Sequence, residues 1–231
     1  MEISNRLKKI ASMTEKCRCI ADIGTDHGYL PIYLIKNKVC DKAIASDINK
    51  GPINKARLNI SINKMDNIIE CRLGSGLSTI KPFECDGIII AGMGGNLIRD
   101  IIAEGENIVS AADFTVLQPV QNPEVLREFI YKKGYTILDE ELCIDENIFY
   151  EIIKIKWDKT FKKEKIDPIY YEISKTLMDK KHPLMAQYID YKINKYKQIF
   201  NHIKEESDWA VKRKNQVSDK IRRLEEMKAW L

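Results

Sequence analysis

The sequence lacks several features that would place it in whole classes of protein. Its 231 residues contain no run of about 18 apolar residues, and the first residues lack the apolar core of a secretory signal. Histidine is scarce, with three residues, and the six cysteines are scattered. The nearest two, Cys17 and Cys19, do not have the C-x-x-C spacing of a zinc knuckle or a redox pair. We therefore expect no membrane segment, no metal site, reduced cysteines and a cytoplasmic protein.

Basic residues are concentrated at one end of the chain. Residues 158–231 hold 18 Lys and Arg against 12 Asp and Glu, whereas residues 1–157 hold 20 against 22. A basic tail on a mildly acidic body favours a polyanionic partner that is bound by the tail. A solvated helical surface would carry the same lysines without any partner, so the charge alone leaves both interpretations open.

Strand-like and helix-like patterns alternate over residues 20–157. The expected strands cover 19–24, 42–48, 68–76, 86–95 and 114–120, followed by two more that are joined by a short turn. One expected helix begins near residue 30, and three more cover 51–65, 96–105 and 123–134. This alternation predicts a Rossmann-like α/β fold, with a mixed, mostly parallel seven-stranded sheet and helices on both faces.

Beyond Trp157 the pattern becomes purely helical. Residues 158–168 are predicted to be a charged linker, and residues 169–181 a helix that ends before Pro183. Together with the segment that follows, they form a predicted second domain, 158–231, after a first domain that covers 1–157.

Apolar residues in this second domain recur every three or four positions, which is typical of a coiled coil. We predict helices over 184–206 and 208–231, folded back on each other near Ser207. One long helix is the alternative, because the apolar spacing continues weakly across the break.

The segment GTDHG, residues 24–28, follows the first predicted strand. In a sheet of this kind ligands bind beyond the carboxyl ends of the strands, so this loop is the expected site. A dinucleotide fingerprint needs a third glycine where Asp26 stands, because the backbone must approach a pyrophosphate there. A carboxylate in that place disfavours NAD and favours a nucleoside with cationic groups, such as S-adenosylmethionine.

The predicted cofactor residues lie at the ends of the first four strands. Asp47, at the end of the second strand, is placed to bind the ribose hydroxyls. Each glycine alone also fits a simple turn, and only the combination at matched strand ends favours a ligand site. The predicted set is Asp22, Gly24, Thr25, Asp26, His27, Gly28, Asp47, Ile48, Gly74, Ser75, Gly76, Ala91, Gly92 and Met93.

Several motifs occur in an order that resembles a known family. DIGTDHGYLP, SDINKGP, RLGSGL, IIIAGMGG and LQPVQN, preceded by NRLKKIA, are similar to the bacterial tRNA (adenine-22-N1)-methyltransferases, the TrmK family. The resemblance covers about residues 4–157, and the family also carries a helical C-terminal domain. It implies S-adenosylmethionine as cofactor and methyl transfer to N1 of an adenine in tRNA. Ser75 departs from the family pattern, which usually has an Asp that accepts a hydrogen bond from the adenine amino group, and a serine oxygen accepts more weakly.

The implied reaction needs a group near the positive charge that develops on the adenine. We expect Asp26 to meet this charge, with Tyr29 as a stacking or hydrogen-bonding partner. A helix cap and a packing residue are the structural alternatives for these two side chains. The residues expected to contact tRNA are Arg6, Gln118, Asn122, Lys212, Arg213, Arg222 and Arg223. Asn122 fits a helix cap equally well, and the basic residues of the tail fit a solvated helical surface.

Two other functions remain open from the residues alone. One is a methyltransferase that acts on a protein or a small molecule. The other is a non-catalytic tRNA-binding module that has kept the fold, which only Ser75 favours. In each case we expect a monomer.

Overall fold

The computed structural model describes residues 2–161, 165–204 and 207–231, and the chain divides into two compact units, Met1–Ile166 and Asp167–Leu231. The predicted domain boundary falls at the end of the last strand, whereas the division between the units follows Ile166. Residues 162–164 of the predicted linker and residues 205–206 at the predicted end of a helix lie outside the described residues.

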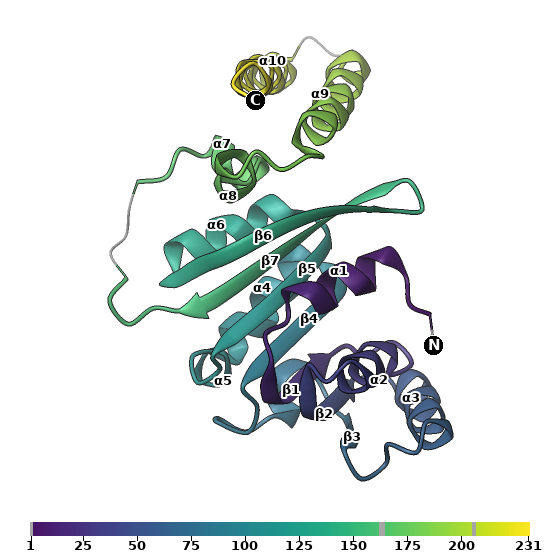
Figure 1. Cartoon of the computed structure of the whole chain (residues 1–231). Helices are drawn as coiled ribbons and strands as arrows, with labels where there is room; N and C mark the ends of the chain where they lie inside the picture. The colour runs from purple at the N-terminus through teal and green to yellow at the C-terminus, as the bar shows by residue number, and fades with distance from the viewer. Residues whose placement is uncertain (1, 162–164, 205–206) are drawn as a thin grey trace. The chain divides into compact units, whose positions relative to one another are not determined.

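The first unit is built on a seven-stranded sheet of order β3-β2-β1-β4-β5-β7-β6 (Figure 1). Only β7 runs antiparallel to its neighbours, β5 and β6. The structure therefore confirms the predicted mixed, mostly parallel sheet. The strands are β1 (Cys17–Ile23), β2 (Cys40–Asp47), β3 (Ile69–Leu73), β4 (Gly87–Gly94), β5 (Phe114–Gln121), β6 (Tyr135–Asp145) and β7 (Ile148–Trp157).

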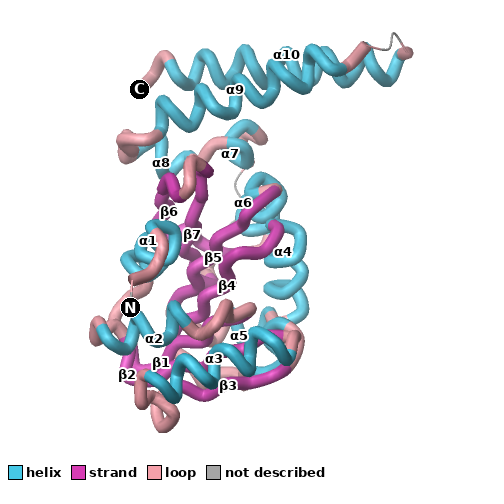
Figure 2. The backbone as a smooth tube through the Cα atoms, turned by 90° about the vertical axis from the view of Figure 1, so that its right-hand side faces the viewer, coloured by secondary structure: helices cyan, strands magenta, loops and turns pink. Residues whose placement is uncertain are grey.

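Helices cover both faces of this sheet, with α1 and α4 on opposite sides of the strands (Figure 2). The reason lies in the apolar run of β4, because successive side chains of a strand point to opposite faces. Ile88 and Ile90 pack with Leu126 of α6, whereas Ile89 packs with Ile10 of α1. The helices of this unit are α1 (Asn5–Met13), α2 (Tyr29–Lys36), α3 (Lys50–Ile62), the 3₁₀ turn η1 (Gly76–Thr79), α4 (Gly95–Glu104), α5 (Glu106–Val109) and α6 (Pro123–Lys132).

The order of the strands reverses at β1, which pairs with β2 on one side and with β4 on the other. All three strands are parallel, so their carboxyl ends meet at one edge of the sheet. Such a switch point leaves a crevice between the two outgoing loops. The loops that follow β1, β2 and β4 are therefore brought together.

The second unit contains four helices within its described residues: α7 (Ile169–Glu172), α8 (Lys175–Asp179), α9 (Met185–His202) and α10 (Asp208–Lys228). The single helix predicted over 169–181 is wrong. The backbone is extended at Ile173, and the Ser174 hydroxyl accepts the Leu177 N–H and so begins a new helix. Ser207 caps α10 in the same way, so α9 and α10 are separate helices.

A buried glutamate connects three helices of this second unit. Glu172 of α7 forms an ion pair with Lys220 of α10, and its carboxylate lies 3.8 Å from the Lys192 ammonium of α9. Burial opposes the ionised carboxylate, but the two ammonium groups outweigh this effect and lower the pKa of Glu172.

An arginine is completely buried between α6 and the last two strands of the first unit. The Arg127 guanidinium lies 2.8 Å from a carboxylate oxygen of Glu140 and 2.6 Å from one of Glu151. Burial disfavours its charge, but the two carboxylates outweigh burial and raise the pKa of Arg127. Each charge of this cluster depends on the others, because none is in contact with bulk water.

We expect Arg127→Met to lower the free energy of unfolding by roughly 3–5 kcal/mol, because it removes the cation that pairs with two buried carboxylates. Urea unfolding followed by circular dichroism measures this loss. Arg99→Met is the matched control, since Arg99 pairs with Asp100 at the surface of α4 and exposed pairs contribute about 0–1 kcal/mol. Equal stability of the two variants would contradict the prediction.

Candidate active site

The glycine loop, residues 24–28, is fixed by the two elements beside it. Gly24 has a φ of 75° and His27 a φ of 59°, so the chain turns back twice within a few residues. The Gly24 N–H donates to the Ser46 carbonyl of β2 at 2.8 Å. The Asn59 side chain of α3, which the sequence did not single out, donates to the His27 carbonyl at 2.9 Å.

Three side chains of the loop and of α2 come together. His27 Nε2 lies 3.4 Å from an Asp26 carboxylate oxygen, and its Nδ1 lies 3.4 Å from the Tyr29 hydroxyl. Gly28, and not Asp26, is the N-terminal cap of α2. The Asp26 side chain is 81% exposed and so free to face a substrate. The cap alternative for Asp26 is therefore wrong.

Asp22 is the second-to-last residue of β1, just before this loop, and it is buried. Burial raises the pKa of its carboxyl from 3.8 to about 6, and the negative charges of Asp26 and Asp47 act in the same direction. Thr25 is 1% exposed, and its hydroxyl acts on the Asp22 carboxylate and partly offsets the effect of burial on that pKa. A carboxylate whose ionised form is disfavoured by burial would be stabilised by a ligand with a cationic group.

The ends of β2 and β3 lie side by side. Asp47 pairs in register with Leu73, and an Asp47 carboxylate oxygen accepts the Asn49 N–H at 2.7 Å. Ile48 is 63% exposed and Leu73 is 46% exposed, so both side chains offer apolar surface beside Asp47. Ile48 is in the set predicted from the sequence, whereas Leu73 is not.

Beyond β3, the predicted adenine loop continues as a tight turn. Gly76 has a φ of 50°, and a Cβ built on it would lie 3.3 Å from Ile101 of α4. The Ser75 side chain is exposed, and its carbonyl accepts the Ser78 N–H at 3.0 Å. Gly74 donates its N–H to the Asp47 carbonyl at 3.0 Å, so this loop is tied to the end of β2.

The irregular end of β4, residues 91–94, contacts the glycine loop directly. The register between β4 and β5 shifts between Ala91 and Met93 and again between Met93 and Gly94, and Gly92 has a φ of 77°. A Cβ built on Gly24 would overlap the Met93 Cε, so the Met93 methyl rests on the Gly24 backbone. The structure thus brings the first and last parts of the predicted cofactor set into contact.

Gln118 and Arg6, which were predicted to contact tRNA, form hydrogen bonds inside the protein. Gln118 is fully buried and makes hydrogen bonds with Arg6, Gly92 and Pro119, so it cannot read a base edge. Arg6 is half-buried and donates to Gln118 at 2.7 Å. Through these hydrogen bonds, the two side chains fix the position of Gly92 in the irregular end of β4.

Asn122, by contrast, is exposed at the N-terminal cap position of α6, where its side chain makes no capping hydrogen bond.

The predicted tRNA residues of the second unit lie on α10. Lys212 and Arg213 are exposed and form no ion pair with any residue that the structure describes. Arg222 pairs with Asp219 and Glu226 along the helix, and Arg223 pairs with Asp167.

Two further features are absent from the described residues. No group of three or more His, Cys, Asp or Glu side chains is arranged there to hold a metal ion. No helix in these parts of the chain is both long and apolar enough to span a bilayer.

Comparison with known proteins identifies the family. The family model described as tRNA (adenine(22)-N(1))-methyltransferase, TrmK, matches residues 20–226. The chain belongs to the TrmK family. The tRNA (adenine(22)-N(1))-methyltransferase of Bacillus subtilis (strain 168) is 35% identical over 153 residues, which are 66% of this chain and 64% of the relative. The chain thus matches less than two thirds of that relative's length.

Solved structures of TrmK proteins match over nearly the whole chain. Sp1610 of Streptococcus pneumoniae, in complex with S-adenosyl-L-methionine, has a TM-score of 0.86 at 27% identity, and the match covers 98% of this chain and 99% of that chain. M. capricolum TrmK, in complex with S-adenosyl-homocysteine, has a TM-score of 0.83 at 27% identity, with the same coverage.

The raised pKa of Asp22 predicts how stability depends on pH. A carboxyl whose pKa rises from 3.8 to about 6 on folding makes its stabilising contribution below pH 3.8 and loses it as the pH rises through 6. At pH 8 we expect the ligand-free Asp22→Asn variant to be more stable than the wild type by about 3 kcal/mol. Near pH 4 the difference should shrink. Melting temperatures measured across this pH range test it, and a difference that does not vary with pH would contradict it.

Proposed function

We propose that this protein transfers a methyl group from S-adenosylmethionine to N1 of adenine 22 in tRNA. The observation that carries the proposal is the acidic crevice at the switch point of a TrmK chain. Asp22, Asp26 and Asp47 surround a glycine loop there, with no third glycine for a pyrophosphate. Carboxylates in such a place favour a cationic nucleoside over a phosphorylated one.

The residues of the crevice fit this cofactor. Asp47 is placed to accept hydrogen bonds from the ribose hydroxyls, and the exposed apolar Ile48 and Leu73 offer surface to an adenine. Asp22 favours the cationic end of the cofactor. When bound, the cofactor supplies an electrophilic methyl group on a positively charged sulfur.

The chain's own residues then act by positioning and by charge. N1 of adenine has a free lone pair at neutral pH, so no base is needed before the attack, and alignment of the reacting atoms is the main requirement. Asp26, with its exposed carboxylate, meets the positive charge that develops on the adenine, and Tyr29 contacts the base.

The reactive nitrogen lies on the Watson–Crick edge, which is hidden while the base is paired. We therefore propose that the enzyme binds the adenine unpaired or flipped out of the stack. The glycine-rich end of β4 allows a planar base to approach closely. A cytoplasmic monomer remains the expected form of the protein.

Transfer of labelled methyl groups to unmodified tRNA tests the function. We expect one N1-methyladenine at position 22, which is lost when that adenine is replaced by guanine. Methylation of a protein or small molecule instead would identify another acceptor. Binding of tRNA without binding of the cofactor would indicate a non-catalytic module.

Asp47→Asn should weaken binding of S-adenosyl-homocysteine about 10- to 100-fold, because hydrogen bonds to a charged acceptor contribute about 1.5–3 kcal/mol. Titration calorimetry measures the change. Asp41→Asn is the matched control, because Asp41 is exposed near the opposite end of the same strand. Equal affinities in the two variants would exclude Asp47 as the ribose ligand.

The structure separates the basic residues of α10 into two groups for a test of tRNA binding. Lys212→Glu with Arg213→Glu should weaken binding and reduce its salt dependence, by a slope of roughly 0.7–0.9 for each phosphate that is no longer neutralised. Arg222→Glu with Arg223→Glu should have a smaller effect, because acidic neighbours already compensate these charges. Filter binding at several salt concentrations measures both, and the reverse order would contradict the assignment.

A further inference from the structure

The side chain of Arg6 connects the N-terminal helix α1 to the irregular end of β4, residues 91–94. Arg6 Nη1 donates to Gln118 Oε1 at 2.7 Å, and the same oxygen accepts the Gly92 N–H at 3.2 Å. Gln118 Nε2 donates to the Pro119 carbonyl at 2.8 Å. Because Gln118 is fully buried, both ends of its amide are satisfied inside the protein.

The irregular end of β4 explains why a buried glutamine stands here. Gly92 falls out of register with β5, where Ala91 pairs with Gln118 and Met93 with Pro119. Proline has no N–H, so β5 cannot continue a regular ladder at this point. Gly92 has no partner residue in this register, and the Gln118 side chain accepts its N–H instead.

Arg6 is itself held from three sides. Its backbone N–H donates to an Asp145 carboxylate oxygen at 3.3 Å, and its guanidinium carbon lies 5.5 Å from the centre of the Tyr150 ring. The Ser4 hydroxyl caps the start of α1 by accepting the Leu7 N–H. The guanidinium therefore meets Gln118 from a fixed position.

We infer that Arg6 is a positioning residue for methyl transfer, which acts through Gln118 on Gly92. The bulge that this network holds is also the one that presses Met93 onto Gly24 of the cofactor loop. Arg6 thus fixes the acceptor side of the crevice against its cofactor side. The inference rests on the proposed function, and it replaces the expected direct contact between Arg6 and tRNA.

The hydrogen bond from Arg6 is charge-assisted, so it is stronger than one from a neutral donor. Without it, Gln118 can turn and release the Gly92 N–H. Displacement of a positioning element by about 1 Å can slow a reaction about 100-fold, because the reacting atoms must be aligned. The expected effect is therefore on turnover and not on tRNA affinity.

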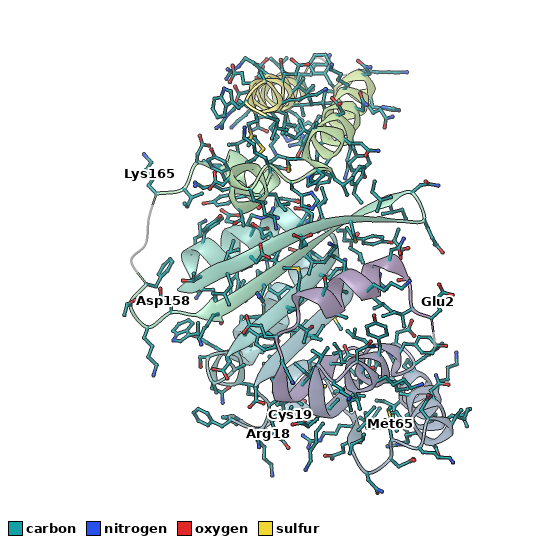
Figure 3. All side chains as sticks on the ribbon, in the orientation of Figure 1. Glu2, Arg18, Cys19, Met65, Asp158 and Lys165 are labelled. Atoms are coloured by element: carbon teal, nitrogen blue, oxygen red, sulfur yellow. The ribbon has the colours of Figure 1, made fainter. Side chains whose placement is uncertain are left out.

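The test compares Arg6→Gln in α1 with Arg18→Gln, the same change near the start of β1. Arg18 is labelled at the lower edge of the first unit, and it pairs there with Asp86 (Figure 3). In Arg6→Gln we expect kcat to fall at least tenfold, with the Kd for tRNA and its salt dependence unchanged within about twofold. Arg6→Lys, which keeps one charged donor, should recover part of kcat. Arg18→Gln should behave as the wild type.

A second readout does not depend on activity. In ¹⁵N-labelled protein the Gly92 amide should shift and exchange faster in Arg6→Gln and in Gln118→Met, and the double variant should show no further change. Far-UV circular dichroism identifies any variant that loses the fold. If Arg6→Gln does not fold, Arg6→Lys is compared with the wild type in its place.

Two results would overturn the inference. One is a loss of tRNA affinity with a reduced salt dependence in Arg6→Gln, which would show a phosphate contact. The other is an unchanged Gly92 amide. If the wild type methylates no tRNA, the proposed function fails, but the amide of Gly92 still decides whether Arg6 holds the loop.

Discussion

The site depends on the absence of a side chain at Gly24. Its positive φ turns the chain away from β1, and the space that a Cβ would fill holds the methyl of Met93. Two loops that are almost 70 residues apart in the sequence therefore touch, and each limits the position of the other. The crevice at the switch point is shaped by this contact as much as by the sheet beneath it.

The electrostatics of the crevice are unfavourable until a ligand arrives. Burial and two neighbouring carboxylates raise the pKa of Asp22, so its ionised form at neutral pH reduces the stability of the empty protein. A cationic ligand removes this penalty. The residue that weakens the fold is thus one that favours the ligand, as is common where function and stability compete.

Much of the first unit was predictable, because its signals are local. The run Ile88–Ile90 indicated a strand buried on both faces, and the glycine loop identified the switch point. The burial of Gln118 was not foreseen, because nothing in the sequence shows that β4 bulges opposite a proline. The break after Ile173 was missed for a similar reason, since an apolar residue at helical spacing gave no sign of extended backbone.

The Gln118 side chain also determines which hydrogen bonds the acceptor loop can no longer offer. Because the Gly92 N–H is already bonded to Gln118, it is not available to an incoming base. A donor aimed at N1 of adenine would occupy the lone pair that has to attack the methyl group. In the proposed reaction, the bond to Gln118 removes this N–H from competition for the N1 lone pair. The same bond limits what this end of β4 can donate to any ligand.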